Sequence, residues 1–166
     1  MTCLFELSIA LLITLLNGFF VMAEYSLVRI RKSRLDELIR QGKSRANTVL
    51  KMSEKLDTYL SATQLGITAS SLLLGWFGGP LLAEMFRGMF GVSAGTWYDH
   101  SLVFACAFLI IVFLHVVFGE LVPRTIALGK VEQVAMAVAY PLVLFHYLLY
   151  PLVVLFNRIS HAVLCL

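Results

Sequence analysis

Four long apolar blocks dominate the pattern of hydrophobic and polar positions along the chain. They cover residues 4–28, 59–83, 101–128 and 134–156. Crossing a hydrocarbon core of about 30 Å takes roughly 20 helical residues, and every block is at least that long. Residues 1–16 carry no lysine or arginine ahead of the apolar run, whereas a cleaved secretion signal begins with basic residues. The first block is therefore expected to remain as a membrane span.

The fourth block differs because it contains two prolines. Pro141 and Pro151 lack the backbone N–H that an interior helical turn donates, so each is expected to interrupt the helix. Broken helices at membrane depth are tolerated where packing or a cavity satisfies the freed carbonyl groups. We therefore predict an all-α integral membrane protein with three spans, at about 4–28, 59–83 and 101–125, and a Pro-broken juxtamembrane belt at 132–165. A simple fourth span with an external C-terminus is the alternative.

The polar segment between the first two blocks, residues 30–57, predicts a helical hairpin. Apolar side chains recur at helical spacing on either side of Gly42, which is expected to end the first of the two helices. These side chains are Leu35, Leu38, Ile39, Val49, Leu50 and Met52. The hairpin is expected to lie against the membrane surface. Helix breakers between Gly75 and Pro80 are expected to end the second span before a loop at 84–100.

Composition and charge agree with this assignment and orient the chain. It is 60% hydrophobic and 14% charged, whereas soluble domains average about 45–50% and about 25%. Nine of the 13 lysines and arginines lie between Arg29 and Lys55, and the 84–100 loop holds only Arg87. The positive-inside rule makes the hairpin cytoplasmic and the N-terminus external, with the C-terminus on the cytoplasmic side of the cell (inner) membrane. Acidic residues interleave with the basic ones, so nucleic-acid binding is not expected.

Polar side chains that lipid should exclude mark the candidate site, and the second span carries a stripe of them. Its members follow one another at intervals of three or four, which places them on one helical face. They are Ser61, Gln64, Thr68 and Ser71, and Gly75 continues the same helical face. Ser70 lies about 100° from the stripe and is a secondary candidate. The stripe is either a packing contact between helices or a path for a polar solute.

The first span contributes Glu24 and Ser26 near its cytoplasmic end. Ser26 is a candidate ligand, and the alternative is a hydroxyl that bonds to a carbonyl of its own helix. Glu24 is a supporting candidate, and the alternative is a carboxylate that reaches toward the interface or pairs with Arg29 or Arg31.

Glu120 on the third span is the strongest candidate. An intramembrane carboxylate costs on the order of 2.5–3.5 kcal/mol, so it should be paired, protonated or bound to a cation. Pro123 cannot donate to the Gly119 carbonyl four residues earlier, which predicts a bare carbonyl oxygen beside the carboxylate. Carboxylate, carbonyl and hydroxyl oxygens suit a hard cation such as Mg²⁺, Ca²⁺ or Mn²⁺. His115 is either a packed, hydrogen-bonded histidine or a proton-linked group.

Three motifs, in this order, resemble the transmembrane domain of the CorC/CNNM family of magnesium exporters. They are residues 17–26 (NGFFVMAEYS), 60–68 (LSATQLGIT) and 118–124 (FGELVPR). The resemblance implies a homodimer in the lipid bilayer that exports Mg²⁺, with sodium-coupled export. It places the ion site on Ser26, Thr68, Ser71, Gly119 and Glu120. Many relatives have asparagines where this chain has Ile67, Thr68 and Ser71, so the second-span ligand stays open.

The same resemblance implies cytoplasmic CBS domains in full-length relatives. The sequence ends at Leu166, so we expect either an isolated membrane domain or the membrane part of a longer protein that carries the CBS domains. No Gly-x-Ser-x-Gly, His-Glu-x-x-His or phosphate-loop motif is present, and an enzyme is not expected. Two rival hypotheses remain: a membrane anchor and dimerisation module, and a transporter of Na⁺, H⁺ or another divalent ion.

Overall fold

The structure is a computed structural model that describes the backbone of residues 2–90 and 97–164. Side chains are described for residues 7–78, 105–106, 108–159 and 162–163. The regular elements within these ranges are all helices, which confirms the predicted fold class. The chain divides into a first unit, Met1–Gly18 with Thr68–Val122, and a second unit, Phe19–Ile67 with Pro123–Leu166.

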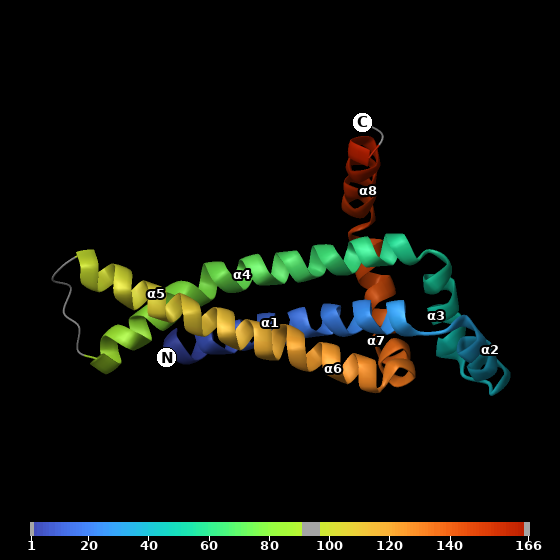
Figure 1. The fold of residues 1–166 in the computed structure, drawn as a ribbon, viewed down its shortest axis with the longest axis horizontal. Helices are drawn as coiled ribbons and strands as arrows, with labels where there is room; N and C mark the ends of the chain where they lie inside the picture. The colour runs from blue at the N-terminus through green and yellow to red at the C-terminus, as the bar shows by residue number, and fades with distance from the viewer. Residues whose placement is uncertain (1, 91–96, 165–166) are drawn as a thin grey trace. The chain divides into compact units, whose positions relative to one another are not determined.

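Figure 1 shows the helices in chain order. They are α1 (Thr2–Arg29), α2 (Lys32–Arg40), α3 (Ser44–Glu54), α4 (Leu56–Phe90), α5 (Trp97–Leu114), the π-helix η1 (His115–Leu121), α6 (Val122–Gly129), α7 (Val131–Leu148) and α8 (Tyr150–Leu164). Helices α1 and α4 begin in one unit and end in the other.

The predicted hairpin is confirmed as α2 and α3 of the second unit. Gly42 between them has a φ of 82°, a left-handed conformation that glycine adopts without steric cost. The apolar positions that predicted the hairpin are turned inward because their spacing matches the helical turn. The core of this unit contains Leu35, Leu38, Val49 and Met52 together with Val138, Leu142 and further small side chains of α7.

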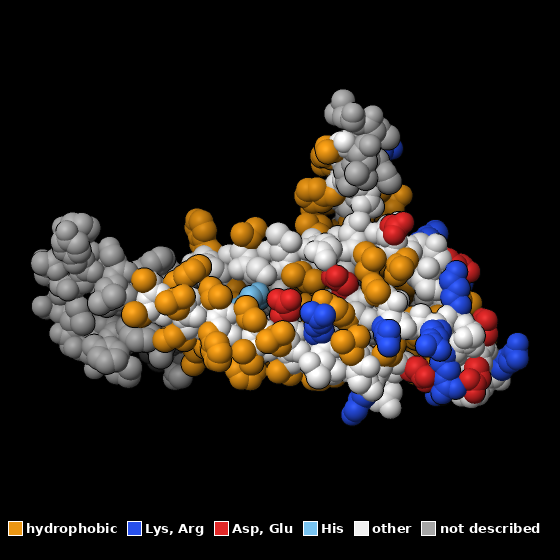
Figure 2. All heavy atoms as spheres, viewed as in Figure 1, with side chains coloured by type: hydrophobic (Ala, Val, Ile, Leu, Met, Phe, Trp, Pro, Cys, Tyr) orange, Lys and Arg blue, Asp and Glu red, His pale blue; other side chains and the backbone are white. Residues whose placement is uncertain are grey.

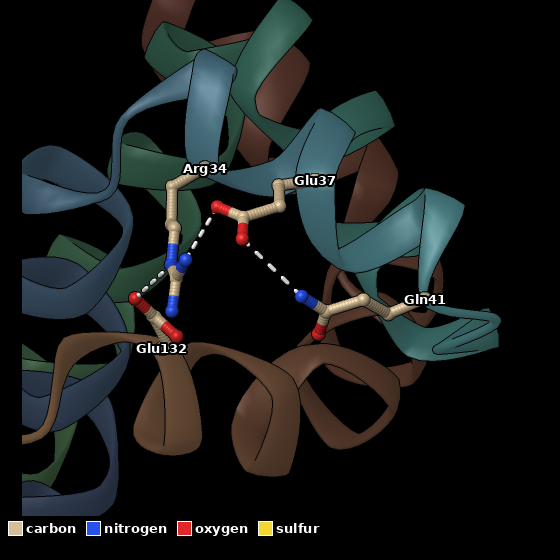
Figure 3. Close-up of polar contacts among 4 residues, drawn as sticks. All are labelled: Arg34, Glu37, Gln41 and Glu132. Carbon is tan, nitrogen blue, oxygen red and sulfur yellow. Dashed lines mark hydrogen bonds and ion pairs between the residues drawn. The ribbon is translucent and has the colours of Figure 1, made fainter.

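The arginine at position 34 joins α2 to α7 on the surface of the second unit. Its Nε donates to Glu132 Oε1 at 2.6 Å, and its guanidinium also pairs with Glu37, whose other oxygen accepts from Gln41 (Figure 3). Hydrogen bonding to Glu132, and secondly to Glu37, raises the pKa of Arg34 above its usual value. Because the pKa of Arg34 is higher in the folded than in the unfolded chain, its contribution to folding stability is complete below the unfolded pKa. That contribution is lost only in strongly alkaline solution.

We therefore expect Arg34→Ala to lower the melting temperature slightly, by the same amount across neutral pH. The pair is exposed, so solvent and salt screen it. Thermal unfolding of the purified chain at low and high salt measures the effect, with Lys32→Ala, another exposed cation of α2, as control. Leu38→Ala leaves a cavity in the core and should lower the melting temperature much more. A decrease of that size for Arg34→Ala would show that the ion pairs of Arg34 stabilise the fold more than expected for exposed pairs.

Pro141 does not interrupt its helix, so that prediction is wrong. Helix α7 runs through it and ends instead at Leu148, with Leu149 as its C-cap. One missing hydrogen bond is outweighed because Val138, Ala139 and Leu142 are buried around it. Pro151 lies in the first turn of α8, where the N–H would have no partner within the helix.

The expected stop between Gly75 and Pro80 is also wrong. Helix α4 continues to Phe90, so residues 84–90 are helical, and α5 begins at Trp97, earlier than predicted. Residues 91–96 of the expected loop lie outside the described residues. The glycines reduce helix propensity by about 1 kcal/mol each. At Gly78 tertiary packing offsets this cost, because a Cβ there would lie 3.0 Å from Ile111 Cδ1.

Three described helical stretches are long and apolar enough to cross a membrane: Leu7–Arg29, Phe108–Gly129 and Val131–Leu148. Helix α4, whose described part carries the polar stripe, is not among them, and the span at 59–83 stays a prediction. The 35 residues of α4 extend about 52 Å, which is ample length. In Figure 2 charged side chains gather over α2 and α3, whereas hydrophobic side chains cover much of the surface elsewhere. This distribution is typical of spans that continue into a polar juxtamembrane segment.

Candidate functional site

The helix that carries Glu120 changes its geometry just before that residue. Helix α5 ends at Leu114, and residues His115–Leu121 form the π-helix η1. The N–H of Val122 reaches the carbonyl of Val117, five residues earlier. Single π-helical turns are rare in proteins, and those that are present are frequently found at functional sites. Gly119 and Glu120 lie within this turn.

The Gly119 carbonyl is not bare, contrary to prediction. Asn17 of α1 donates a hydrogen bond from Nδ2 to Gly119 O at 2.9 Å, across 102 positions of sequence. Asn17 is 1% exposed, so water cannot take its place. The loss of the Pro123 donor was predicted correctly, but the replacement donor comes from a different helix.

Two more polar side chains surround the Gly119 backbone. His115 Nε2 and Ser71 Oγ are 3.1 Å apart and share a hydrogen bond, so His115 is a hydrogen-bonded histidine. A Cβ at position 119 would lie 3.0 Å from His115 Nδ1 and 3.2 Å from Asn17 Nδ2. Only glycine lets both groups lie so close to the backbone. We call Asn17, Ser71, His115 and Gly119 the η1 polar cluster.

The η1 polar cluster has unused hydrogen-bonding capacity. Asn17 Oδ1 and His115 Nδ1 are buried and have no hydrogen-bond partner among the described residues. Buried polar atoms are paired in the great majority of cases, and exceptions often accompany a bound water or ion. Glu120 follows the cluster directly in sequence and is exposed on the single chain. An otherwise apolar cavity of about 330 Å³ in the first unit is lined in part by Thr14 and His115.

A second group of polar side chains lies in the second unit. Gln64 Nε2 donates to both carboxylate oxygens of Glu24, at 3.0 and 3.1 Å, and Thr63 Oγ1 lies 3.5 Å from one of them. Glu24 is therefore held by α4. Ser26 is buried, and its hydroxyl donates to Ala23 O at 3.1 Å, which is the alternative stated for it from sequence.

The polar stripe of α4 is only partly turned inward. Gln64, Thr68 and Gly75 are exposed on the single chain, and Ser71 is half-buried. Ser61 bonds to Asn157 of α8 at 2.6 Å, which is a packing contact. The buried face of α4 lies one position away, at Thr63, Gly66, Ser70, Leu74 and Gly78. The secondary candidate Ser70 is thus more deeply buried than the stripe itself.

The predicted site residues are divided between the two units. Thr68, Ser70, Ser71, Gly119 and Glu120 belong to the first unit, and Glu24, Ser26, Gln64 and Pro123 to the second. A single oxygen cage made from both sets remains a prediction. Among the described residues, no group of three or more His, Cys, Asp or Glu side chains could hold a metal ion. A site here would therefore combine Glu120 with hydroxyl, amide and carbonyl oxygens.

Sequence reasoning missed two residues, Asn17 and Thr63. Both are polar groups within apolar blocks, which is the criterion that selected Glu24 and Ser26. Along α1 the nearest polar neighbours of Asn17 are Thr14, three residues before it, and Glu24, seven residues after it, so no adjacent polar residue marks this position in the sequence. Its partner, Gly119, became evident only in the folded chain.

Comparison with known proteins gives one family. Residues 7–166 match the family model described as the Cyclin M transmembrane N-terminal domain, CNNM. The chain is 42% identical over 151 residues to the UPF0053 protein YhdT of Bacillus subtilis, covering 90% of this chain and 32% of that protein. It is 41% identical over 143 residues to YugS of the same organism, covering 86% and 33%, and 35% identical over 160 residues to sll0260 of Synechocystis, covering 96% and 36%. The chain thus spans about a third of the length of these relatives.

Proposed function

Because this chain belongs to the CNNM family of transmembrane domains, a transporter family rather than an enzyme family, we propose that it binds and exports Mg²⁺. We propose further that export is coupled to a Na⁺ gradient. The motifs at residues 17–26, 60–68 and 118–124 indicate the same family.

One observation carries the proposal: a carbonyl oxygen that is fixed by a hydrogen bond from another helix belongs to the residue directly before a glutamate in the π-helix η1. The Gly119 carbonyl is held by Asn17, and the next residue is Glu120. Mg²⁺ takes oxygen ligands in near-ideal octahedral geometry and gives up its water reluctantly. A fixed carbonyl oxygen can take the place of one water ligand at a defined position. A carboxylate neutralises part of the charge of the ion and so helps to offset the cost of removing its water.

In the proposed mechanism, Glu120 neutralises the ion while neutral oxygens replace part of its hydration shell. The hydroxyl groups of Thr68, Ser70 and Ser71 on α4, and of Ser26 on α1, are the proposed neutral ligands beside the Gly119 carbonyl. Gln64, Glu24 and Pro123 support the site. The spans would tilt about their glycine-rich and proline-containing segments to expose the ion to either side in turn.

We also propose that the domain is a homodimer. Glu120 and Thr68 are exposed on the single chain, although both lie in segments proposed to cross the membrane. Exposing a carboxylate to lipid is costly, so a second copy that covers it would stabilise the assembly. The relatives are about three times this length, and we propose that the full-length protein carries cytoplasmic CBS domains in addition to the membrane domain.

Ion flux in proteoliposomes tests the proposal most directly. The purified chain is reconstituted, and Mg²⁺ movement is followed with and without an opposing Na⁺ gradient, after competition between Mg²⁺, Ca²⁺ and Mn²⁺ for binding. We expect Mg²⁺ binding, and Mg²⁺ flux that increases with the Na⁺ gradient. Flux of another cation without Mg²⁺ flux would replace the proposed cargo, and equal flux without Na⁺ would remove the coupling.

One rival function has support of its own. The Ser26 hydroxyl bonds within its own helix, and Ser61 bonds to Asn157 of α8, as expected of polar groups that only pack helices in an anchor module. Ser26→Ala separates the two functions because it removes a hydroxyl with little change in shape. A ligand role predicts weaker Mg²⁺ binding with an unchanged dimer. If the dimer weakens first and flux declines with it, the anchor function is correct.

A further inference from the structure

We propose that Asn17 is a positioning residue of the ion site: its side-chain amide holds the Gly119 carbonyl oxygen in the orientation that binds the cation. This inference rests on the proposed function and adds a residue of α1 to it. The contact that carries it is the 2.9 Å hydrogen bond from Asn17 Nδ2 to Gly119 O. Both residues belong to the first unit.

The Gly119 carbonyl needs a donor from outside because its own helix supplies none at the usual position. In an α-helix the donor would be the residue four positions later, which is Pro123, and proline has no N–H. The preceding turn is already widened, since the Val122 N–H reaches Val117. A carbonyl released from the helical ladder can rotate, so a donor that fixes its direction determines where the oxygen points.

The amide of Asn17 is suited to this task by its burial and by its orientation. Asn17 is 1% exposed, so the bond does not compete with bulk water. The acceptor at Gly119 requires the nitrogen side of the amide to face it, which fixes the orientation of the whole group. A carbonyl oxygen accepts at two positions, and Asn17 occupies one. The inference requires the cation to bind at the other position.

The surroundings of Gly119 hold this arrangement in place. His115 Nδ1 and Asn17 Nδ2 lie 3.0 and 3.2 Å from the point where a Cβ would be, so both side chains pack directly on the backbone. The imidazole is held in turn through its other nitrogen by Ser71. Groups that orient a metal ligand in this way typically change affinity by roughly 10- to 100-fold when they are removed.

Isothermal titration of the purified chain with Mg²⁺ alone and with Ca²⁺ alone tests the inference. Asn17→Leu keeps the size of the side chain and removes the amide. We expect the Kd for Mg²⁺ to rise roughly 10- to 100-fold. The Kd for Ca²⁺ should rise less, because Ca²⁺ accepts irregular geometry whereas Mg²⁺ does not. The Mg²⁺-to-Ca²⁺ preference should therefore fall, which a general loss of stability would not cause.

Thr14→Val is the matched control. Thr14 lies one turn earlier on α1, is half-buried, and its hydroxyl donates to Ala10 O of its own helix at 2.9 Å. We expect this substitution to leave both Kd values unchanged. Should Asn17→Leu fail to fold, Asn17→Ala removes the amide and leaves no side-chain donor, and it carries the same expectation.

The outcomes separate this inference from the proposed function. If the unmodified chain binds no Mg²⁺, the proposed function fails. If the unmodified chain and the folded Asn17 variant bind Mg²⁺ equally, with the same Mg²⁺-to-Ca²⁺ preference, the positioning role is overturned while the proposed function stands. A parallel loss of affinity for both ions that follows the melting temperature would also overturn it, because Asn17 would then be only structural.

Discussion

Glu120→Gln is expected to abolish Mg²⁺ flux while the helices remain folded. The substitution keeps the shape of the side chain and removes the negative charge that would neutralise the ion. Two unit charges 4 Å apart attract by about 4 kcal/mol at an effective dielectric constant near 20, and a divalent ion in contact gains more. A loss of about 4 kcal/mol corresponds to nearly a thousandfold weaker binding. Titration calorimetry and Mg²⁺ flux in proteoliposomes measure it.

The matched control is Glu54→Gln, which removes an exposed carboxylate near the end of α3. It should leave both Mg²⁺ binding and flux unchanged. Circular dichroism and the size of the reconstituted particle report whether the Glu120 variant keeps its helices and its dimer. If Glu120→Gln binds Mg²⁺ as tightly as the unmodified chain, the Glu120 carboxylate is not a ligand of the ion.

Gly66→Ala is expected to destabilise the second unit strongly. A Cβ at this position would lie 2.6 Å from the ring of Phe20, closer than any real contact. The ring cannot move away easily, because it is 2% exposed and packs against Phe145 with ring centres 4.6 Å apart. Overpacking of a core costs typically 1–3 kcal/mol. A lower melting temperature of the purified chain is the expected result.

Gly75→Ala on the same helix provides the control. Nothing lies within 4 Å of the Cβ that it would add, so the higher helix propensity of alanine should stabilise α4 by up to about 1 kcal/mol. Combining Gly66→Ala with Phe20→Leu should recover part of the lost stability, since the smaller side chain vacates the space. Additive losses in the double variant would mean that Phe20 and Gly66 do not contact each other.

The helical elements were largely predictable because their signals are local. Leu35, Leu38, Val49 and Met52 have the spacing of an amphipathic helix, and the structure buries all of them. Gly42 ended its helix as predicted. Helix ends were less predictable where tertiary packing opposed local propensity, as at Pro141 in α7 and at the glycines of α4. A single missing hydrogen bond or a glycine costs less than the burial of the neighbouring side chains stabilises.

The candidate site was predictable in its residue types and less so in its contacts. Glu120 and Gly119 were identified because a carboxylate and a proline-released carbonyl are rare within an apolar span. The stripe of α4 was identified by its period, yet the buried face lies at Thr63, Gly66 and Ser70. A periodicity defines which residues share a face, and only the neighbouring helices decide whether that face is covered.

The sequence by itself determined that this chain is helical, belongs in a membrane, and carries oxygen-bearing residues where lipid should exclude them. These properties follow from hydropathy, spacing and backbone chemistry, which act over a few residues. The tertiary structure alone decided that Asn17 holds the Gly119 carbonyl and that Gln64 holds Glu24. Those contacts join residues about 100 and 40 positions apart, and a hydrogen bond between helices depends on how their surfaces pack rather than on either segment alone.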